Sequence, residues 1–181
     1  MNMQNELSHE QQKLLETWEN HTRYEFETKS VNQTMETMID TPYVNHVPTM
    51  TGGFGKEEVE QFYSKSFISQ IPEDTEMTLV SRTIGTNQIV DELIFKFTHT
   101  IRMDWMLKGI EPMGKRVEIP LVAVIGFQDG KIASEHIYWD QASVLVQLGL
   151  IHSNRLPVYG IETTHKVMEL KNRANNLVKT S

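Results

Sequence analysis

The stretch Val117–Gly149, VEIPLVAVIGFQDGKIASEHIYWDQASVLVQLG, decides the fold. Residues 117–127 are apolar at nearly every position and lead into Asp129-Gly130. This dipeptide favours a type I′ hairpin, because both central residues of that turn need positive φ. Residues 131–140 return as a second strand, and the apolar run after them predicts a short helix that ends at Gly149.

The returning strand carries the residues that could perform chemistry. His136, Tyr138 and Asp140 are spaced two apart, and alternate residues of a strand share one face of the sheet. A base, a phenol and a carboxylate on one face are typical of an enzyme pocket. We therefore expect these three side chains to point into the protein and the side chains between them to point outward.

Composition indicates one globular domain. The chain has 181 residues and no cysteine, which excludes disulfides, thiolate catalysis and thiolate metal sites. A net charge of -7 argues against a nucleic-acid surface, which needs a basic field. Met1–Glu10 has no apolar leader segment, and no apolar run approaches the roughly 20 residues of a membrane span. We expect a cytoplasmic protein that binds neither nucleic acid nor membrane.

Helical spacing dominates the first part of the chain. Ser8 and Gln11 have the capping-box pattern, and the apolar residues behind them predict a long helix over 9–29. The further elements predicted for this part are a helix over 31–39, an extended segment over 42–48, a loop over 51–55 and a helix over 56–68.

From residue 76 onward the pattern is that of strands. The elements predicted there are strands over 76–84 and 89–102, joined by a tight turn, and a hydrophobic loop over 103–113. Helices followed by long antiparallel strands define an α+β layout, with the helices on one face of the sheet. A strongly curled sheet closed by a helix forms a cone around an interior cavity. Residues 1–150 make up this domain, and residues 151–181 are a C-terminal extension that is part of the same unit or partly disordered.

Three motifs resemble one known family. They are GIEPMGKRV at 109–117, FQDGKI at 127–132 followed by Glu135, His136 and Asp140, and QLG at 147–149. Together they resemble SnoaL-like proteins, polyketide ester cyclases and their relatives in the NTF2-like superfamily, and the resemblance is firm over residues 57–150. It implies a cone of curved antiparallel sheet packed on N-terminal helices, and it implies cofactor-free chemistry and dimers. Asp140 matches the aspartate that acts as general base in the cyclases.

Each candidate catalytic residue also has a structural interpretation. Asp140 precedes a helix and could serve as its N-cap, as the base, or as both. Its pKa would rise in an apolar cavity, towards the range that a base needs. His136 and Tyr138 could stabilise negative charge on a carbonyl oxygen, or could be a satisfied histidine and an aromatic that fills the cone.

Further residues are expected around the pocket. Val122 and Val124 would line it, Trp18 or Thr22 would close it from the helix, and His46 would lie near its mouth. The pair Arg102 and Asp104 could lie at that mouth, or could form a surface ion pair. His46, Asp104 and His136 could in principle hold a metal, but no metal-binding spacing supports this. We expect no metal and no cofactor.

Apolar side chains outside the pocket suggest a second copy of the chain. Ile137 and Trp139 would be exposed on the outer face of the sheet beside Glu135, and such a pair favours a partner. The loop at Trp105 would be a substrate lid or a further dimer contact. These features predict a homodimer.

Three functions fit the sequence. The first is an enzyme that abstracts a proton next to a carbonyl, in an isomerisation, cyclisation or dehydration, with Asp140 as base. The second is a non-catalytic module that binds an apolar ligand in the same cone. The third is a hydrolase that positions a water molecule. In each case the partner is a small apolar or carbonyl-containing molecule.

Overall fold

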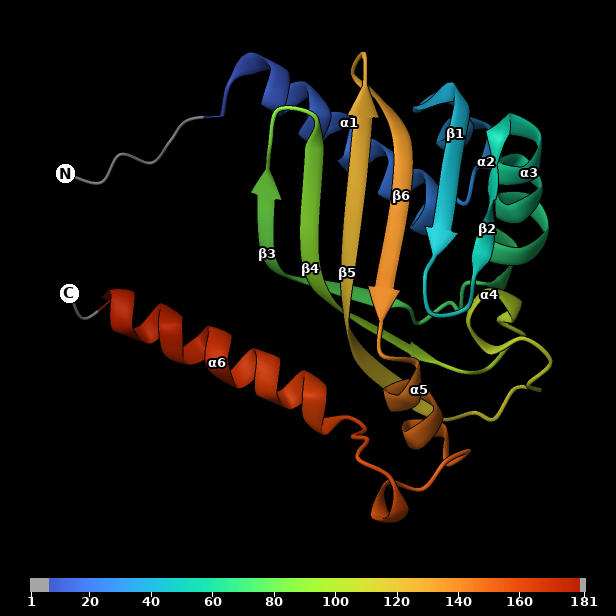
Figure 1. Ribbon diagram of the computed structural model, residues 1–181, viewed down its shortest axis with the longest axis vertical. Coiled ribbons are helices and arrows are strands. Elements are labelled where there is room, and N and C mark those ends of the chain that lie inside the picture. The colour runs from blue at the N-terminus through green and yellow to red at the C-terminus, as the bar shows by residue number, and fades with distance from the viewer. Residues whose placement is uncertain (1–6, 180–181) are drawn as a thin grey trace.

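The computed structural model describes residues 7–179 as a curved sheet with helices on both sides (Figure 1). The elements are α1 (His9–Phe26), α2 (Val31–Glu36), β1 (Met38–His46), β2 (Thr51–Phe54), α3 (Gly55–Phe62), a π-helical turn η1 (Tyr63–Phe67), η2 (Ile68–Gln70), β3 (Glu76–Ile84), β4 (Gln88–Thr98), α4 (Asp104–Leu107), β5 (Arg116–Gln128), β6 (Lys131–Trp139), α5 (Gln141–Leu148), η3 (Ser153–Arg155) and α6 (Glu162–Lys179).

The six strands form one open sheet in the order β2-β1-β6-β5-β4-β3. The four long strands β3 to β6 pair antiparallel, as their alternation and turns predict. Strand β1 pairs with β6 in parallel, a contact that the sequence did not predict. Met38 and Ile39, assigned to a helix from their spacing, begin this strand, and the expected loop 51–55 contributes β2. The α+β class and the curved sheet on N-terminal helices are confirmed.

Local signals place the helix ends and the central turn. Ser8 and Gln11 form the complete capping box at the start of α1. Asp129 and Gly130 both have positive φ, 52° and 77°, so the turn between β5 and β6 is of the expected kind. Asp140 caps α5 by accepting a hydrogen bond from the Ala142 backbone N–H.

The faces of β5 and β6 are the reverse of those expected. Glu135, Ile137 and Trp139 are buried on the inner face, whereas His136 is only half-buried and Tyr138 is 44% exposed on the outer face. Both faces of this hairpin carry apolar residues, so alternation alone does not say which one turns inward. A shift of one residue in phase exchanges every side chain between the two faces.

The apolar loop around Trp105 is part of the core. Trp105, Met106 and Leu107 of α4 are buried, together with Met103 before it. They close the end of the cone beside Phe67 and Phe95, whose rings lie 5.1 and 6.0 Å from the Trp105 ring. Neither this loop nor the Ile137–Trp139 pair is an exposed patch, so the surface argument for a dimer is wrong. The homodimer and the cytoplasmic location stay predictions from the sequence.

The C-terminal extension is hydrogen-bonded to the sheet. In α6, the Thr164 hydroxyl donates to the Glu118 carbonyl of β5 at 2.8 Å, and the Lys171 ammonium donates to the Leu79 carbonyl of β3 at 2.6 Å. Residues 180–181 of this extension and residues 1–6 of the polar Met1–Glu10 segment lie outside the described residues. No helix within residues 7–179 combines the length and the apolar character needed to cross a bilayer.

Gly52 and Gly55 make a matched pair for testing the β1–β2 hairpin. A Cβ at Gly52, φ 139°, would lie 1.9 Å from the Val44 carbonyl oxygen, whereas a Cβ at Gly55, φ 79°, would meet nothing within 4 Å. We expect Gly52→Ala to lower the free energy of unfolding by about 3 kcal/mol or more, and Gly55→Ala by about 1 kcal/mol. Urea unfolding measures both values, and equal losses would contradict the observed pairing.

Candidate functional site

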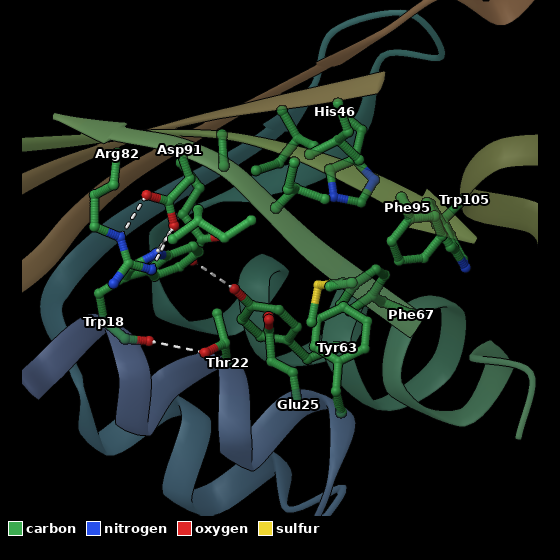
Figure 2. Close-up of a pocket in the computed structure, with 18 residues that line it drawn as sticks. Trp18, Thr22, Glu25, His46, Tyr63, Phe67, Arg82, Asp91, Phe95 and Trp105 are labelled. Carbon is green, nitrogen blue, oxygen red and sulfur yellow. Dashed lines mark hydrogen bonds and ion pairs between the residues drawn. The ribbon is translucent and has the colours of Figure 1, made fainter. Parts of the chain in front are cut away.

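A cavity of about 170 Å³ lies between α1 and the inner face of the sheet (Figure 2). Its walls are mostly apolar and aromatic, and its mouth lies near the exposed side chains of Met77 and Leu79 on β3. Besides Thr22, whose hydroxyl is bonded to α1 carbonyls, three sets of polar residues interrupt the apolar wall: Glu25, Tyr63 and Glu135; Trp18, Arg82 and Asp91; and His46.

The first set is organised by His21, which lies behind the cavity wall. His21 Nε2 is 3.2 Å from Glu25 Oε1 and 3.0 Å from Glu135 Oε1, and all three side chains are buried. Glu25 lies one turn after His21 on α1, and Glu135 faces them from β6. Two carboxyl groups therefore meet at one ring nitrogen.

The hydrogen bonds of His21 require protons on both ring nitrogens. The Thr37 hydroxyl donates to the Thr34 carbonyl, so its oxygen accepts from His21 Nδ1–H at 2.6 Å. Nε2 faces two carboxyl oxygens and must donate to them. Burial lowers the pKa of His21, but the charges of Glu25 and Glu135 outweigh burial and raise it to about 10. His21 is an imidazolium near neutral pH.

The single positive charge of His21 stabilises the ionised form of only one of the two carboxyl groups, Glu25 and Glu135. Burial raises the pKa of Glu25, and the attraction of His21 offsets this only in part. Burial also acts to raise the pKa of Glu135, but the charge of His21 and the hydrogen bonds from His21 and Tyr63 lower it overall. The pair therefore consists of an ionised Glu135 and a Glu25 that holds its proton more tightly, a separation typical of acid and base pairs in enzymes.

The free oxygens of these carboxyls are available to the cavity. Tyr63 donates its hydroxyl to Glu135 Oε1 at 2.8 Å, the same oxygen that His21 contacts. Within the described residues, Oε2 of Glu135 and Oε2 of Glu25 have no hydrogen-bond partner, and both side chains line the cavity. The network holds one side of each carboxyl group and leaves the other side for a ligand.

The second set is satisfied within itself. Arg82 donates from Nε and Nη2 to the two oxygens of Asp91, at 2.7 and 2.8 Å. Trp18 Nε1 donates to Asp91 Oδ2 at 2.8 Å, and the remaining Arg82 nitrogen donates to Glu19. The hydrogen bond to Asp91 and its charge raise the pKa of Arg82. The set fixes α1 to β3 and β4 beside the cavity.

His46 forms the third polar point of the wall. Its ring is surrounded by the rings of Phe62, Phe67, Trp105 and Trp139, with centroids 5.2 to 5.6 Å away. Burial lowers its pKa to about 4, against a smaller opposing effect of Glu135. His46 is therefore neutral near neutral pH.

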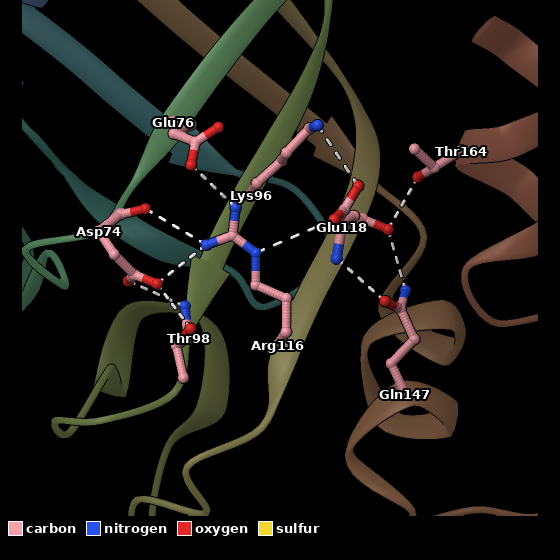
Figure 3. A network of polar contacts seen from close by, with 8 residues as sticks. All are labelled: Asp74, Glu76, Lys96, Thr98, Arg116, Glu118, Gln147 and Thr164. Carbon is pink, nitrogen blue, oxygen red and sulfur yellow. Dashed lines mark hydrogen bonds and ion pairs between the residues drawn. The ribbon is translucent and has the colours of Figure 1, made fainter.

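A second polar cluster lies around Arg116 on β5, away from this cavity (Figure 3). Arg116 is paired with Asp74 at 2.9 Å and Glu76 at 3.1 Å. Gln147 of α5 makes two hydrogen bonds to the backbone of Glu118, the same residue whose carbonyl accepts from α6. These groups are partnered and hold the helices to the strand, so we assign the cluster a structural role.

The expected pocket residues are only partly brought together. Trp18, Thr22 and His46 line the cavity. His136, Tyr138, Val122 and Val124 lie on the outer face, where His136 Nε2 is 3.1 Å from the Tyr43 hydroxyl. Asp140 is exposed and caps α5. Arg102 and Asp104 form a 3.0 Å surface ion pair and do not line the cavity. The expectation that Asp140, His136 and Tyr138 face the cavity is wrong, because the opposite face of β6 turns inward.

Five residues of this site were not predicted from the sequence: His21, Glu25, Tyr63, Arg82 and Glu135. One signal was present in α1, where His21 and Glu25 continue the buried stripe of Leu14 and Trp18. Two titratable residues on the apolar face of a helix need partners, and such partners are often functional. The partner Glu135 lies far away in the sequence, and no local pattern links it to α1.

His21, Glu25 and Glu135 also have the chemistry of metal ligands. Their ligand atoms lie within 4.8 Å of one another, and they are the one such group among the residues that the structure describes. The suggested trio of His46, Asp104 and His136 is not brought together. A metal ion at the buried group would have to replace the proton on His21 Nε2, which both carboxyl groups now share.

Comparison with known proteins gives the class of this fold and site. The family model of SnoaL-like polyketide cyclases matches residues 14–148, and the chain therefore belongs to the SnoaL-like polyketide cyclase family. No curated protein matches the chain.

Solved structures with the same fold share little sequence with the chain. A protein described as a SnoaL-like polyketide cyclase from Jannaschia sp. CCS1 has a TM-score of 0.65 and 17% identity, over 82% of this chain and 99% of its own. The epoxide hydrolase/cyclase-like enzyme SalBIII, of pyran ring formation in the polyether salinomycin, has a TM-score of 0.54 and 18% identity, over 71% and 91%. A protein of ketosteroid isomerase-like fold from Catenulispora acidiphila DSM 44928, in complex with trimethylamine, has a TM-score of 0.58 and 13% identity, over 74% and 92%.

Burial of neutral His46 makes the protein less stable in acid. The unfolded chain protonates this residue near pH 6.5, whereas the native protein does so only near pH 4. The stability that His46 contributes is therefore present above pH 6.5 and is lost as the pH falls towards 4. We expect acidification from pH 7 to 4.5 to lower the free energy of unfolding of the parent by about 2 kcal/mol more than that of His46→Phe. Urea titrations at the two pH values measure this difference, and equal losses would show that His46 titrates normally.

Proposed function

We propose that this protein is an enzyme that transfers a proton at a carbon next to a carbonyl group, in a small and mostly apolar molecule held in the interior cavity. Glu135 is the base and Glu25 the acid. The observation that carries this proposal is the pair of buried carboxyl groups, joined by one imidazolium and open to the cavity.

The proposed step uses the free oxygens of the two carboxyl groups. The carbon–hydrogen bond breaks, its proton moves to Glu135 Oε2, and the electron pair moves into the carbonyl group, which gains negative charge on oxygen. Glu25 then delivers its proton to the intermediate at carbon or oxygen. His21 contacts both carboxyl groups, so it can pass its Nε2 proton to Glu25 and take one from Glu135. These two proton transfers restore the ionised Glu135, the protonated Glu25 and the imidazolium of His21.

The surroundings suit this chemistry. Few solvent dipoles compete inside a mostly apolar cavity, so a carboxylate there acts more strongly on a bound carbonyl compound. Hydrogen bonds from His21 and Tyr63 hold Glu135 in one orientation. Such fixed positioning of a base is a large part of its effect on rate.

The same features weigh on the alternatives. A module that only binds an apolar ligand needs no pair of buried titratable groups, which are costly unless they are paired. For a hydrolase, Asp91 is the other acidic residue on the wall, but Arg82 and Trp18 already occupy its oxygens. Binding without catalysis would show itself in the exchange experiment below as a ketone that binds but does not exchange its hydrogens.

Deuterium exchange tests the proposed base without knowledge of the natural substrate. We expect the protein to speed the exchange of the hydrogens next to the carbonyl of cyclohexanone in D₂O, followed by proton NMR. Glu135→Gln should lower this rate by about 10²- to 10⁴-fold, because the amide keeps the shape of the side chain but does not accept a proton. Glu25→Gln should slow a full isomerisation in the same way.

Asp140→Asn is the matched control for these variants. It keeps the side-chain oxygen that caps α5, so both the exchange rate and the melting temperature should stay close to those of the parent. Loss of exchange in this variant, with Glu135→Gln fully active, would move the base back to Asp140. A protein that binds the ketone without speeding its exchange would be a binding module.

Metal dependence is a separate test of the same cluster. Because the acid and the base belong to this chain, we expect exchange to be unchanged after dialysis against EDTA and after addition of Mn²⁺ or Zn²⁺. Activity that is lost with EDTA and restored by a metal ion would mean that His21, Glu25 and Glu135 hold that ion instead of a shared proton.

A further inference from the structure

His46 is the cavity-wall side chain whose hydrogen bonding is incomplete. Its Nδ1 atom is buried and has no hydrogen-bond partner, and the other unpartnered buried side-chain atoms among the described residues belong to His99, which does not line the cavity. Apart from the outer oxygens of Glu25 and Glu135, the other polar groups of the wall are bonded to each other, to His21 or to the backbone, including the Thr22 hydroxyl, which donates to α1 carbonyls. Among the wall residues, His46 therefore carries the buried nitrogen that lacks a partner, whereas the outer oxygens of Glu25 and Glu135 are unpartnered but open to the cavity.

The surroundings of His46 leave few sources for this partner within the protein. Its nearest rings, those of Phe62, Phe67, Trp105 and Trp139, present edges and faces to it. A buried polar atom without a partner costs free energy, and an apolar residue in the same place would avoid that cost. Neutral imidazole both donates and accepts, so a ligand with one oxygen atom can supply this hydrogen bond once a turn of the His46 ring brings the buried nitrogen to the cavity.

His46 and Glu135 are neighbours on the inner face. In the parallel pairing of β1 and β6, Val44 lies opposite Glu135 and His46 opposite Ile137, so His46 is diagonal to Glu135. Figure 2 shows His46 on the sheet side of the cavity, across from Glu25 and Tyr63 on the helical side. A ligand oxygen at His46 therefore brings the adjacent carbon atoms towards the carboxyl pair.

The volume of the cavity limits how many rings the ligand can have. Its volume is about 170 Å³, and an apolar protein cavity of about 150 Å³ takes up benzene. One six-membered ring with small substituents fits, and a molecule of three or four fused rings does not. Phe67, Phe95, Trp105 and Leu121 offer apolar and aromatic contacts to such a ring.

We propose that the ligand is a single-ring, mostly apolar molecule with one carbonyl or hydroxyl oxygen, and that His46 binds that oxygen and so selects oxygenated rings over hydrocarbon rings. The orientation towards Glu135 rests on the proposed function, whereas the binding role of His46 does not. His46 is thus a specificity-determining residue, and in the reaction it would stabilise the charge that develops on oxygen.

Binding measurements with small probes test this proposal. Ligand-observed NMR would give dissociation constants for cyclohexanone, phenol, toluene and a four-ring steroid ketone. We expect the parent to bind cyclohexanone and phenol more tightly than toluene, and not to bind the steroid. His46→Phe keeps an aromatic ring in the aromatic surroundings, and should weaken the two oxygenated ligands by about tenfold or more while toluene binds as before.

Two further variants separate this proposal from the proposed function. His136→Phe, on the outer face, should leave all four affinities unchanged. Glu135→Gln should bind cyclohexanone like the parent but lose exchange. If Glu135→Gln exchanges normally while His46→Phe has lost its preference for oxygen, the proposed base is wrong and His46 still selects the ligand. Two results would overturn the present proposal. One is that the parent, like His46→Phe, binds toluene as tightly as the oxygenated rings, and the other is that the parent binds the steroid tightly.

Discussion

The buried imidazolium of His21 is the interaction on which the rest of the structure depends. It lets two carboxyl groups, Glu25 and Glu135, exist in the apolar space between a helix and a sheet. Without its charge, ionisation of either carboxyl group there would be strongly unfavourable. Because one partner lies on α1 and the other on β6, the same contacts set the position of the helix on the sheet. The position of that helix in turn sets the height and the contents of the cavity.

This constraint explains why a charged residue occupies the inner face of β6. Glu135 is buried on this face beside Ile137 because His21 and Tyr63 satisfy its carboxyl group. Its neighbours Ile137 and Trp139 then also face inward, and His136 and Tyr138 face outward. The inner face thus carries few polar groups. The Glu135 carboxyl group is held on one side by His21 and Tyr63, whereas His46 has a buried ring nitrogen without a hydrogen-bond partner.

What could be predicted from the sequence was determined by local interactions. The Asp129-Gly130 turn, the capping box at Ser8 and the cap at Asp140 each depend on a few neighbouring residues, and all are present. The choice of inner face depends on long-range contacts. The segment 121–125 is apolar on both faces, so the alternation of its residues does not show which face is buried against the helices. No local sequence pattern marks the parallel pairing of β1 with β6 or the contact between Glu135 and His21. The sequence therefore indicated the correct strand, β6, for the candidate site, but the face opposite to the one that lines the cavity.

Nitrogen-15 NMR of the histidine rings tests the central claim most directly. With both nitrogens protonated and its pKa raised to about 10, His21 should give the imidazolium signature at pH 8, where an ordinary histidine is neutral. Glu135→Gln should shift its titration to lower pH, because one of the two negative partners is gone. A His21 that titrates near pH 6.5 in the parent protein, or that is unaffected by Glu135→Gln, would contradict the shared-proton cluster and with it the proposed acid and base.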